Sequence, residues 1–353
     1  MRRVLIDNLK GNEIVARPVY SVNGSFLLSK GIHIKMSYVN RLAELGVDYI
    51  YIEDELSKGV ELKDFIEENT RESCKKEVKK VLENFSTQGN LELSSIVTAA
   101  QDIVESVLGQ RDIIVNLIDI RRKDEYTYAH SVNVCALAVL LSIKLGYNKN
   151  KVRDIAVGAL LHDLGKVLVP EEILNKTTEL TDKEKEIVKQ HVIYGYEAIS
   201  DASWISSISK VIILTHHENI DGSGYPFGWR GDKINNATKI ISICNVFDSM
   251  VSKKPYREAY KIYEVIEYLV ANKGKLFDSD LVDVFIKYIA VYPSGMGIIT
   301  DSGERGIVLK QNNGFPARPV IRIIGNEEED YEEWIEVDLL ENKKMFIIDT
   351  YEI

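Results

Sequence analysis

The chain has 353 residues, of which 45% are hydrophobic and 28% charged, the balance of a globular protein with a large core. Its formal net charge of −10 argues against a nonspecific nucleic-acid binder, because no broad basic surface attracts phosphates. Its three cysteines, Cys74, Cys135 and Cys244, are widely spaced. They exclude a disulfide framework and favour a reducing cytoplasm. Charged residues near the N-terminus argue against a signal peptide, and no apolar run is long enough to predict a membrane span.

The first 55 residues predict a small α/β unit. A hairpin is expected around Asn23-Gly24, followed by a helix that Gly46 stops and by one more strand. A charged helix over about residues 60–86 continues from this unit and is read as a connection, so the first domain is placed at 1–95. Within the α/β unit, the expected hairpin arms, helix and last strand are, in that order, Val15–Ser21 and Ser25–Leu28, Tyr38–Leu45, and Val47–Ile52.

Helices dominate the next stretch, because apolar residues recur there at spacings of three and four. We expect them at Ile96–Leu108, Ile113–Ile120, Ser131–Leu145, Val152–Leu161, Lys183–Ile199 and Ile205–His216. After Tyr292-Pro293 the pattern changes to short β-rich runs at Gly306–Leu309, Val320–Ile324, Trp334–Leu339 and Met345–Ile348. The predicted fold is therefore mainly α, with a helical domain at 96–290 and a small β subdomain at 291–353.

Five of the six histidines fall between residues 130 and 217. A single histidine such as His130, on an apolar helical stripe, is more often a hydrogen-bonded core residue than a ligand. His162-Asp163 and His216-His217, however, each follow an apolar helical run. A buried carboxylate must be compensated, and adjacent histidines point in different directions, so they can serve two ions. The cluster therefore predicts a metal site, and a double one.

These strings resemble the HD-GYP family, a branch of the HD-domain metal-dependent phosphohydrolases. The resemblance rests on His162-Asp163 with Gly165-Lys166, and on His216-His217-Glu218 continuing to Gly224-Tyr225-Pro226. It extends from about Asp124 to Arg257. It implies a helical catalytic domain that binds iron or manganese ions and hydrolyses cyclic di-GMP to pGpG or GMP.

The resemblance also assigns roles to residues. Two ions would be held by His130, His162, Asp163, His191, His216, His217 and the residue at position 245, with Asp163 between them. A hydroxide that bridges the ions would attack phosphorus in line, and Lys166 would stabilise a phosphoryl oxygen. Tyr225, Lys254 and Arg257 would contact the substrate, although the basic run around Lys253 could equally be a solvated helix start. Glu218 and Asp221 are read as groups that hold the histidines in place.

The chain departs from the family pattern at position 245, where Asn replaces an expected aspartate ligand. An amide oxygen can coordinate but carries no charge, so one metal position should be weakened. Asp248 is three residues further on, and we do not expect it to take over as a ligand. A carboxylate that helps some relatives to hold a third ion is replaced by Tyr126, so at most two metals are expected.

The leading hypothesis is a cyclic di-GMP phosphodiesterase with a weakened binuclear site. The alternatives are a noncatalytic cyclic di-GMP receptor or scaffold, and a phosphohydrolase of another cyclic dinucleotide. The flanking domains could contact other signalling proteins, and the charged helices could pair in a homodimer.

Overall fold

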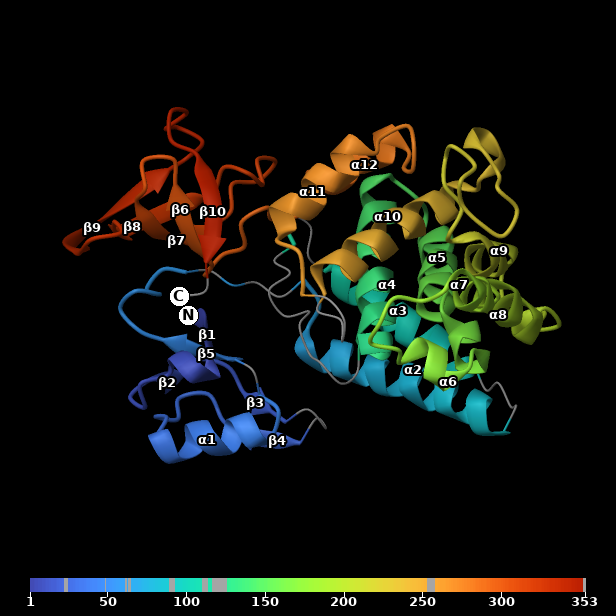
Figure 1. Cartoon of the computed structure of the whole chain (residues 1–353), viewed down its shortest axis with the longest axis horizontal. Coiled ribbons are helices and arrows are strands. Elements are labelled where there is room, and N and C mark those ends of the chain that lie inside the picture. Colours follow the sequence, from blue (N-terminus) through green and yellow to red (C-terminus); the bar gives the residue numbers. More distant parts are fainter. Residues whose placement is uncertain are drawn as a thin grey trace.

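The structure is a computed structural model that describes residues 1–21, 25–47, 49–60, 62, 65–88, 93–109, 114–115, 126–252 and 258–351. A group of helices lies beside two small β-rich units, one from each end of the chain (Figure 1). The predicted fold class, mainly α with a small unit at either end, is confirmed. Among the described residues, no helix is both long and apolar enough to cross a bilayer.

The N-terminal unit contains a three-stranded antiparallel sheet with β1 (Arg2–Leu5), β5 (Tyr49–Glu53) and β2 (Ile14–Val15) in the order β1-β5-β2. The helix α1 (Met36–Glu44) buries Val39 and Leu42 in the same small core. A separate ribbon pairs β3 (Val19–Tyr20) with β4 (Phe26–Leu28). The hairpin pairing predicted between Val15–Ser21 and Ser25–Leu28 is confirmed by β3 and β4, but the first arm is interrupted at Pro18, which has no N–H for a ladder and separates β2 from β3. The predicted Asn23-Gly24 turn lies outside the described residues.

The main core lies between long helices. These are α2 (Glu68–Gln88), α3 (Ser94–Leu108), α4 (Tyr126–Lys144), α5 (Lys149–Leu161), α9 (Ser207–Thr215) and α10 (Asn236–Val251). Residues 130–142 of α4 are buried on every side, as expected of a helix at the centre of a core. Although α2 was predicted only to connect two domains, it packs Cys74, Val78 and Leu82 into this core. The domain boundary at 95/96 stays a prediction, and this packing favours grouping α2 with the helices.

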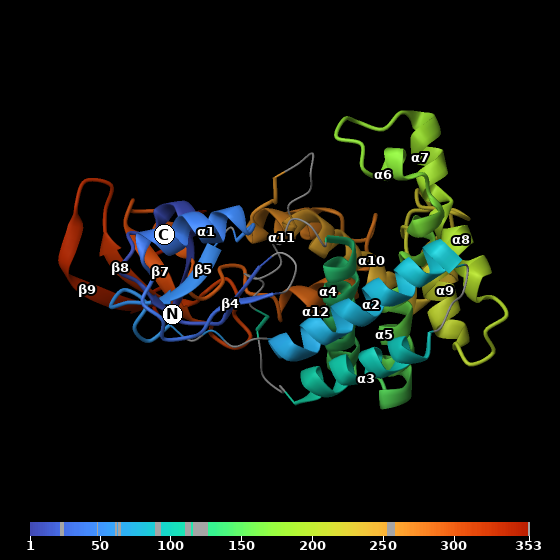
Figure 2. The same ribbon diagram turned by 90° about the horizontal axis from the view of Figure 1, so that it is seen from below.

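Short helices extend this unit on one side. The helices α6 (Glu171–Leu174) and α7 (Asp182–Lys189) project from it, and α8 (His191–Ile199) leads back to α9 (Figure 2). A reciprocal capping box between Thr181 and Glu184 begins α7. The helix predicted over Lys183–Ile199 is present as two helices, α7 and α8, which are separated only at Gln190. The predicted helix at Ile113–Ile120 is wrong at Val115, which forms a β-bridge with Ile289; residues 116–120 lie outside the described part.

Two further helices, α11 (Ile262–Ala271) and α12 (Ser279–Ile286), lead to a five-stranded antiparallel sheet in the order β10-β6-β7-β8-β9. The strands are β6 (Gly297–Thr300), β7 (Arg305–Lys310), β8 (Val320–Gly325), β9 (Asp330–Asp338) and β10 (Ile347–Tyr351). The sequence did not predict β6, because four residues directly after a turn are too few to show alternation. Side chains of this sheet pack against Val60, so the two ends of the chain meet (Figure 1).

Candidate metal centre

Histidines reach the centre of the helical unit mainly from helix ends. His162 follows α5, His191 follows α7 and begins α8, and His216 follows α9. In each case the imidazole Nδ1 lies near a carbonyl in the last turn of the preceding helix. The distances are 2.7 Å to Ala159 O, 2.7 Å to Val188 O and 3.1 Å to Ile213 O, respectively.

This arrangement decides which ring nitrogen faces the centre. The last carbonyls of a helix have no backbone donor within the helix and therefore accept hydrogen bonds from nearby groups. If each Nδ1–H donates to its carbonyl, Nε2 carries no proton, and its lone pair is directed away from the helix end. The sequence placed His162 and His216 at helix ends correctly, but it concealed the same feature at His191 by predicting one continuous helix.

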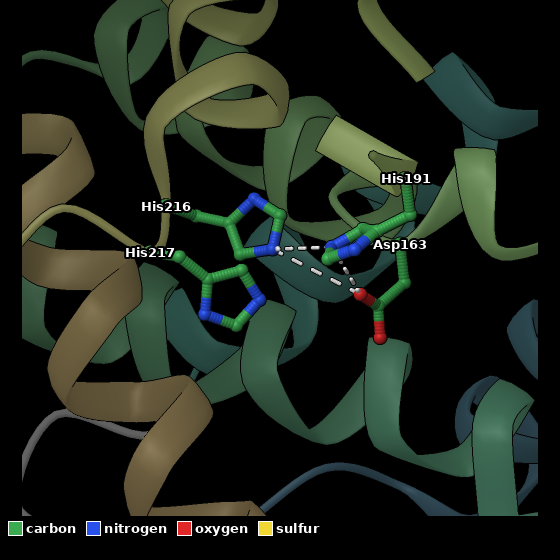
Figure 3. A group of neighbouring side chains, drawn as sticks. All are labelled: Asp163, His191, His216 and His217. Atoms are coloured by element: carbon green, nitrogen blue, oxygen red, sulfur yellow. Dashed lines mark hydrogen bonds and ion pairs between the residues drawn. The ribbon is translucent and has the colours of Figure 1, made fainter. Parts of the chain in front are cut away.

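The Asp163 carboxylate lies between two groups of these nitrogens. Its Oδ1 is 3.5 Å from His191 Nε2 and 3.8 Å from His216 Nε2. Its Oδ2 is 3.4 Å from His162 Nε2 and 3.8 Å from His130 Nε2. One group is thus Asp163, His191, His216 and His217, and the other is His130, His162 and Asp163; within each group the candidate ligand atoms lie within 4.8 Å of one another. Figure 3 shows the first group, with its side chains converging.

The polar atoms of the centre fit a cation better than they fit one another. His162 Nε2 and Asp163 Oδ1 are buried and, among the described residues, have no hydrogen-bond partner. His191 Nε2 and His216 Nε2 face each other at 3.4 Å, although both Nδ1 atoms lie near carbonyls. Buried acceptors without donors are costly, and a divalent ion removes that cost because imidazole and carboxylate are its common ligands. The donor set therefore suits divalent metal ions.

The protonation states agree with this reading. Burial lowers the pKa of His191 to about 4, despite the nearby Asp163 carboxylate. Burial and the neighbouring imidazoles also place the pKa values of His216 and His217 well below the ordinary histidine value. Burial opposes ionisation of Asp163, but His162 and the Lys166 ammonium hold its pKa well below the usual carboxyl value. At neutral pH, His191, His216 and His217 thus present neutral imidazoles to an ionised Asp163 carboxylate, and these are the forms that bind metal.

His130 and Asn245 complete the second group. Asn245 Oδ1 lies 3.0 Å from His130 Nε2, so position 245 faces the centre as its proposed role requires. The other ring nitrogen of His130, Nδ1, lies 2.6 Å from Asp248 Oδ2, and the Asp248 side chain is fully buried. Asp248 therefore lies behind the His130 ring, on the side away from Asn245, and the expectation that it does not replace Asn245 as a ligand stays a prediction. The sequence did not predict this contact with His130.

Lys166 is the cation beside the carboxylate. Its Nζ donates to Asp163 Oδ2 at 2.6 Å, while about a third of its side chain (32%) is exposed. The 3₁₀ helix Leu164–Leu168 carries Lys166 and follows Asp163 directly. The ammonium therefore lies between the carboxylate and solvent, where an incoming anion could also reach it.

The loop after the histidine pair is packed onto the centre. The Tyr225 ring stacks on His217 with 4.6 Å between centroids, and Lys189 Nζ lies 5.6 Å from the Tyr225 ring centroid. Glu218 is buried, and its carboxylate accepts the backbone N–H groups of Phe227 at 2.7 Å and Trp229 at 2.9 Å. Glu218 thus holds the loop that carries Tyr225, rather than a histidine side chain directly.

Among the described residues, Asp221 is a predicted site residue whose side-chain hydrogen bonds stay within its own loop. Asp221 accepts the backbone N–H of Ser223 at 2.9 Å, and its hydrogen bonds to Ser223 lower the pKa of Asp221, so it shapes the loop locally. Lys254 and Arg257, the other predicted substrate contacts, lie outside the described residues, as does the side chain of Tyr126. Their roles stay predictions, as do the individual ligand assignments above.

Comparisons with known proteins match two segments of the chain, one of which contains the metal centre. Residues 112–281 match the HD domain model, and residues 298–352 match a model described as a KOW domain associated with the HD domain. A cyclic di-GMP phosphodiesterase of Pseudomonas aeruginosa is 35% identical over 228 residues, which are 64% of this chain and 55% of that protein.

Two other relatives match over shorter stretches. A cyclic di-GMP phosphodiesterase response regulator of Xanthomonas campestris is 36% identical, covering 48% of this chain and 45% of that protein. A 3'3'-cGAMP-specific phosphodiesterase of Vibrio cholerae is 32% identical, covering 50% of this chain and 34% of that protein. The chain therefore spans between about a third and just over half of the length of these relatives. Residues 112–281 thus match the HD domain model, and the HD-GYP resemblance predicted from the motifs is confirmed.

Proposed function

We propose that this protein is a metal-dependent phosphodiesterase that hydrolyses cyclic di-GMP to pGpG or GMP. The observation that carries the proposal is the division of the Asp163 carboxylate, with one oxygen facing each group of buried histidine nitrogens. A carboxylate that can bridge two cations suits hydrolysis of a phosphodiester, and relatives that cover the helical domain are named cyclic di-GMP phosphodiesterases.

The chain's own residues would position the substrate and screen its charge. Bound divalent ions would supply Lewis-acid chemistry, lowering the pKa of water and neutralising phosphoryl charge. Lys166 would hold a phosphoryl oxygen with its ammonium, which Asp163 orients from behind. Tyr225, stacked on His217, would form one wall of the substrate site. Lys254 and Arg257, which follow α10 in the sequence, would contact the phosphates of the substrate.

We propose that the metal is iron or manganese and that each chain binds two ions. The proposed ligands are imidazole nitrogens, carboxylate oxygens and one amide oxygen, without a thiolate. The three cysteines are free and buried, consistent with the cytoplasmic location that we propose.

Two alternatives rest on specific observations. The neutral Asn245 beside His130 favours a cyclic di-GMP receptor that has lost efficient chemistry, because one metal position lacks a charged ligand. The likeness to the relative named a 3'3'-cGAMP-specific phosphodiesterase favours another cyclic dinucleotide as substrate. A homodimer and contacts with other signalling proteins also remain proposals, and the solution mass from light scattering tests the first.

Product analysis separates these functions. Protein prepared anaerobically and loaded with iron or manganese is incubated with cyclic di-GMP, and in parallel with 3'3'-cGAMP, beside the Asn245→Asp variant. Release of pGpG or GMP by the unaltered protein supports the proposal. Turnover by Asn245→Asp alone supports the receptor, whereas preferential cleavage of 3'3'-cGAMP supports the other substrate. Binding without turnover by either form contradicts the phosphodiesterase.

A further inference from the structure

We infer that Asp248 is a positioning residue for the metal centre, which fixes the ring of His130 and supplies, from behind that ring, the negative charge that Asn245 lacks. The inference rests on the proposed metal-dependent function. The juxtaposition that carries it is one imidazole held between two side chains of α10. Its Nδ1 is 2.6 Å from Asp248 Oδ2 and its Nε2 is 3.0 Å from Asn245 Oδ1.

His130 needs such a partner because of its place in the fold. His162, His191 and His216 follow helix ends, where terminal carbonyls can receive their Nδ1–H groups. His130 instead lies within α4, where backbone N–H groups of the following turn already occupy the carbonyls. A side-chain acceptor has to replace the helix end, and Asp248 from the neighbouring α10 occupies that position.

The contact also determines what His130 presents to the centre. A neutral imidazole has one N–H, and the carboxylate at 2.6 Å requires it on Nδ1. Nε2 then turns a lone pair toward the amide oxygen of Asn245, and Asp163 Oδ2 lies 3.8 Å from the same nitrogen. Two facing acceptors are unfavourable unless a cation lies between them or the amide turns to donate its N–H. Position 245 is thus compatible with a bound ion and, through the amide N–H, with its absence.

The charges make the same point. Asp248 is fully buried, and its Oδ1 has no hydrogen-bond partner among the described residues. A buried carboxylate without a full set of partners is costly, and a cation on the far side of the His130 ring offsets that cost. A carboxylate behind a ligating histidine also makes the ring a stronger donor. An aspartate at position 245 would bring its negative charge into direct contact with the metal. With asparagine there, Asp248 provides the negative charge from the far side of the His130 ring.

Manganese titration of the chain of 353 residues tests this inference without any nucleotide. Calorimetry on chelator-stripped protein should show Asp248→Asn weakening one Mn²⁺ site by about 10- to 100-fold while sparing the other. Asp182→Asn, which removes a carboxylate with a 99% exposed side chain, is the matched control and should leave both sites unchanged. In the Asn245→Asp background, Asp248→Asn should weaken binding less than tenfold, because a ligand carboxylate then supplies the charge. Equal losses in both backgrounds, or no loss in either, would overturn the compensation.

A second readout is independent of metal and needs no altered Asp248. In metal-free wild-type protein, ¹⁵N-histidine NMR should report His130 protonated at Nδ1, with its signals assigned by their loss in His130→Gln. A neutral His130 protonated at Nε2 would refute the positioning role, whether or not Asp248→Asn folds. Because neither measurement involves a dinucleotide, loss of a manganese site in a protein that cleaves no cyclic di-GMP would refute the proposed function alone.

Discussion

Asp163 lies where most of the charged and polar contacts of the centre meet. Its Oδ2 accepts the Lys166 ammonium at 2.6 Å and lies 3.4 Å from His162 Nε2, while its Oδ1 faces His191 at 3.5 Å. It is buried, so its ionised form depends on these neighbours. The same charge that is costly in the metal-free protein is the one that cations would use.

Replacing Asp163 with Asn should therefore separate metal binding from folding. We expect the metal content after loading to fall from two ions to at most one per chain, because the shared carboxylate contributes to both groups. Hydrolysis should fall by at least about 100-fold if the proposed function holds. The metal-free variant should unfold at a temperature close to that of wild type, since a buried charge is also removed. Metal analysis and thermal denaturation check this, and retention of two ions would contradict the bridging role.

At the scale of elements, the centre depends on a close approach between the 3₁₀ helix Leu164–Leu168 and α8. A Cβ on Gly165 would lie 1.9 Å from the carbonyl oxygen of His191 and 2.5 Å from the backbone N of Gly195. These are backbone atoms, which cannot move aside as a flexible side chain can. Glycine at 165 therefore lets the segment that carries Asp163 and Lys166 lie directly against the start of α8, and this brings His191 within reach of the carboxylate.

The variant Gly165→Ala should push α8 away and remove His191 from the centre. Overpacking of this kind lowers the free energy of unfolding by about 1–3 kcal/mol and sometimes more. Metal should also bind more weakly at the site that contains His191. Gly195→Ala is a graded comparison, because its Cβ would meet Ile213 at 3.0 Å and the Gly165 backbone at 3.1 Å, so its effect should be smaller. Denaturant unfolding and metal titration measure both, and equal effects would show that the close approach is not decisive.

The loop after His217 is a second element whose geometry depends on one side chain. Glu218 is buried and receives the backbone N–H groups of Phe227 and Trp229. Removing one partner of a buried hydrogen bond leaves the other unsatisfied, at a cost of about 1–3 kcal/mol. The variant Glu218→Ala should thus lower the free energy of unfolding by that order and raise KM for the substrate, because Tyr225 loses its fixed loop.

Asp221→Asn provides the matched control, because it alters a carboxylate of the same loop that accepts the backbone N–H of the nearby Ser223. It should change both quantities little. Denaturant unfolding and steady-state kinetics are the measurements. If the two variants behave alike, Glu218 has no special role in holding the loop.

At the scale of the whole molecule, the two ends of the chain form a joint unit next to the helices (Figure 1). Val60 packs with Ile307, Leu309 and Val320 of the C-terminal sheet. Arg322 is buried, donates to Leu56 O at 2.9 Å and pairs with Glu336 at 2.7 Å. The segment that follows the N-terminal unit is thus anchored to the C-terminal sheet by apolar packing and by Arg322.

Arg322→Ala should loosen this contact while leaving the metal centre intact. A hydrogen bond from a charged group contributes about 1.5–3 kcal/mol, so the segment around Leu56 should become cleavable by protease at lower protease concentrations. Metal content should not change. Arg305→Ala is the comparison, because Arg305 pairs with the largely exposed Asp330 inside the same sheet. Limited proteolysis followed by mass spectrometry locates the cuts, and equal protection of both variants would exclude the role of Arg322.

The sequence determined the chemistry of the centre and the class of fold. The spacing of apolar residues predicted the main helices, and the histidine motifs identified the residues that the structure brings together. Both signals depend on residues that are close together in the chain. The sequence-based predictions failed where the local pattern of residues did not determine the secondary structure. A helix break at Gln190 leaves the apolar spacing unchanged, and the segment around Val115 pairs with distant Ile289.

Tertiary structure alone decided how those residues act on one another. Nothing in the local spacing shows that Asp248 lies behind His130, because the two are 118 residues apart and meet only when α4 packs against α10. The same holds for the division of Asp163 between two groups of histidines drawn from separate helices. Residue types and periodicity are properties of the chain, whereas tautomers, shared ligands and close backbone approaches depend on distances that packing sets.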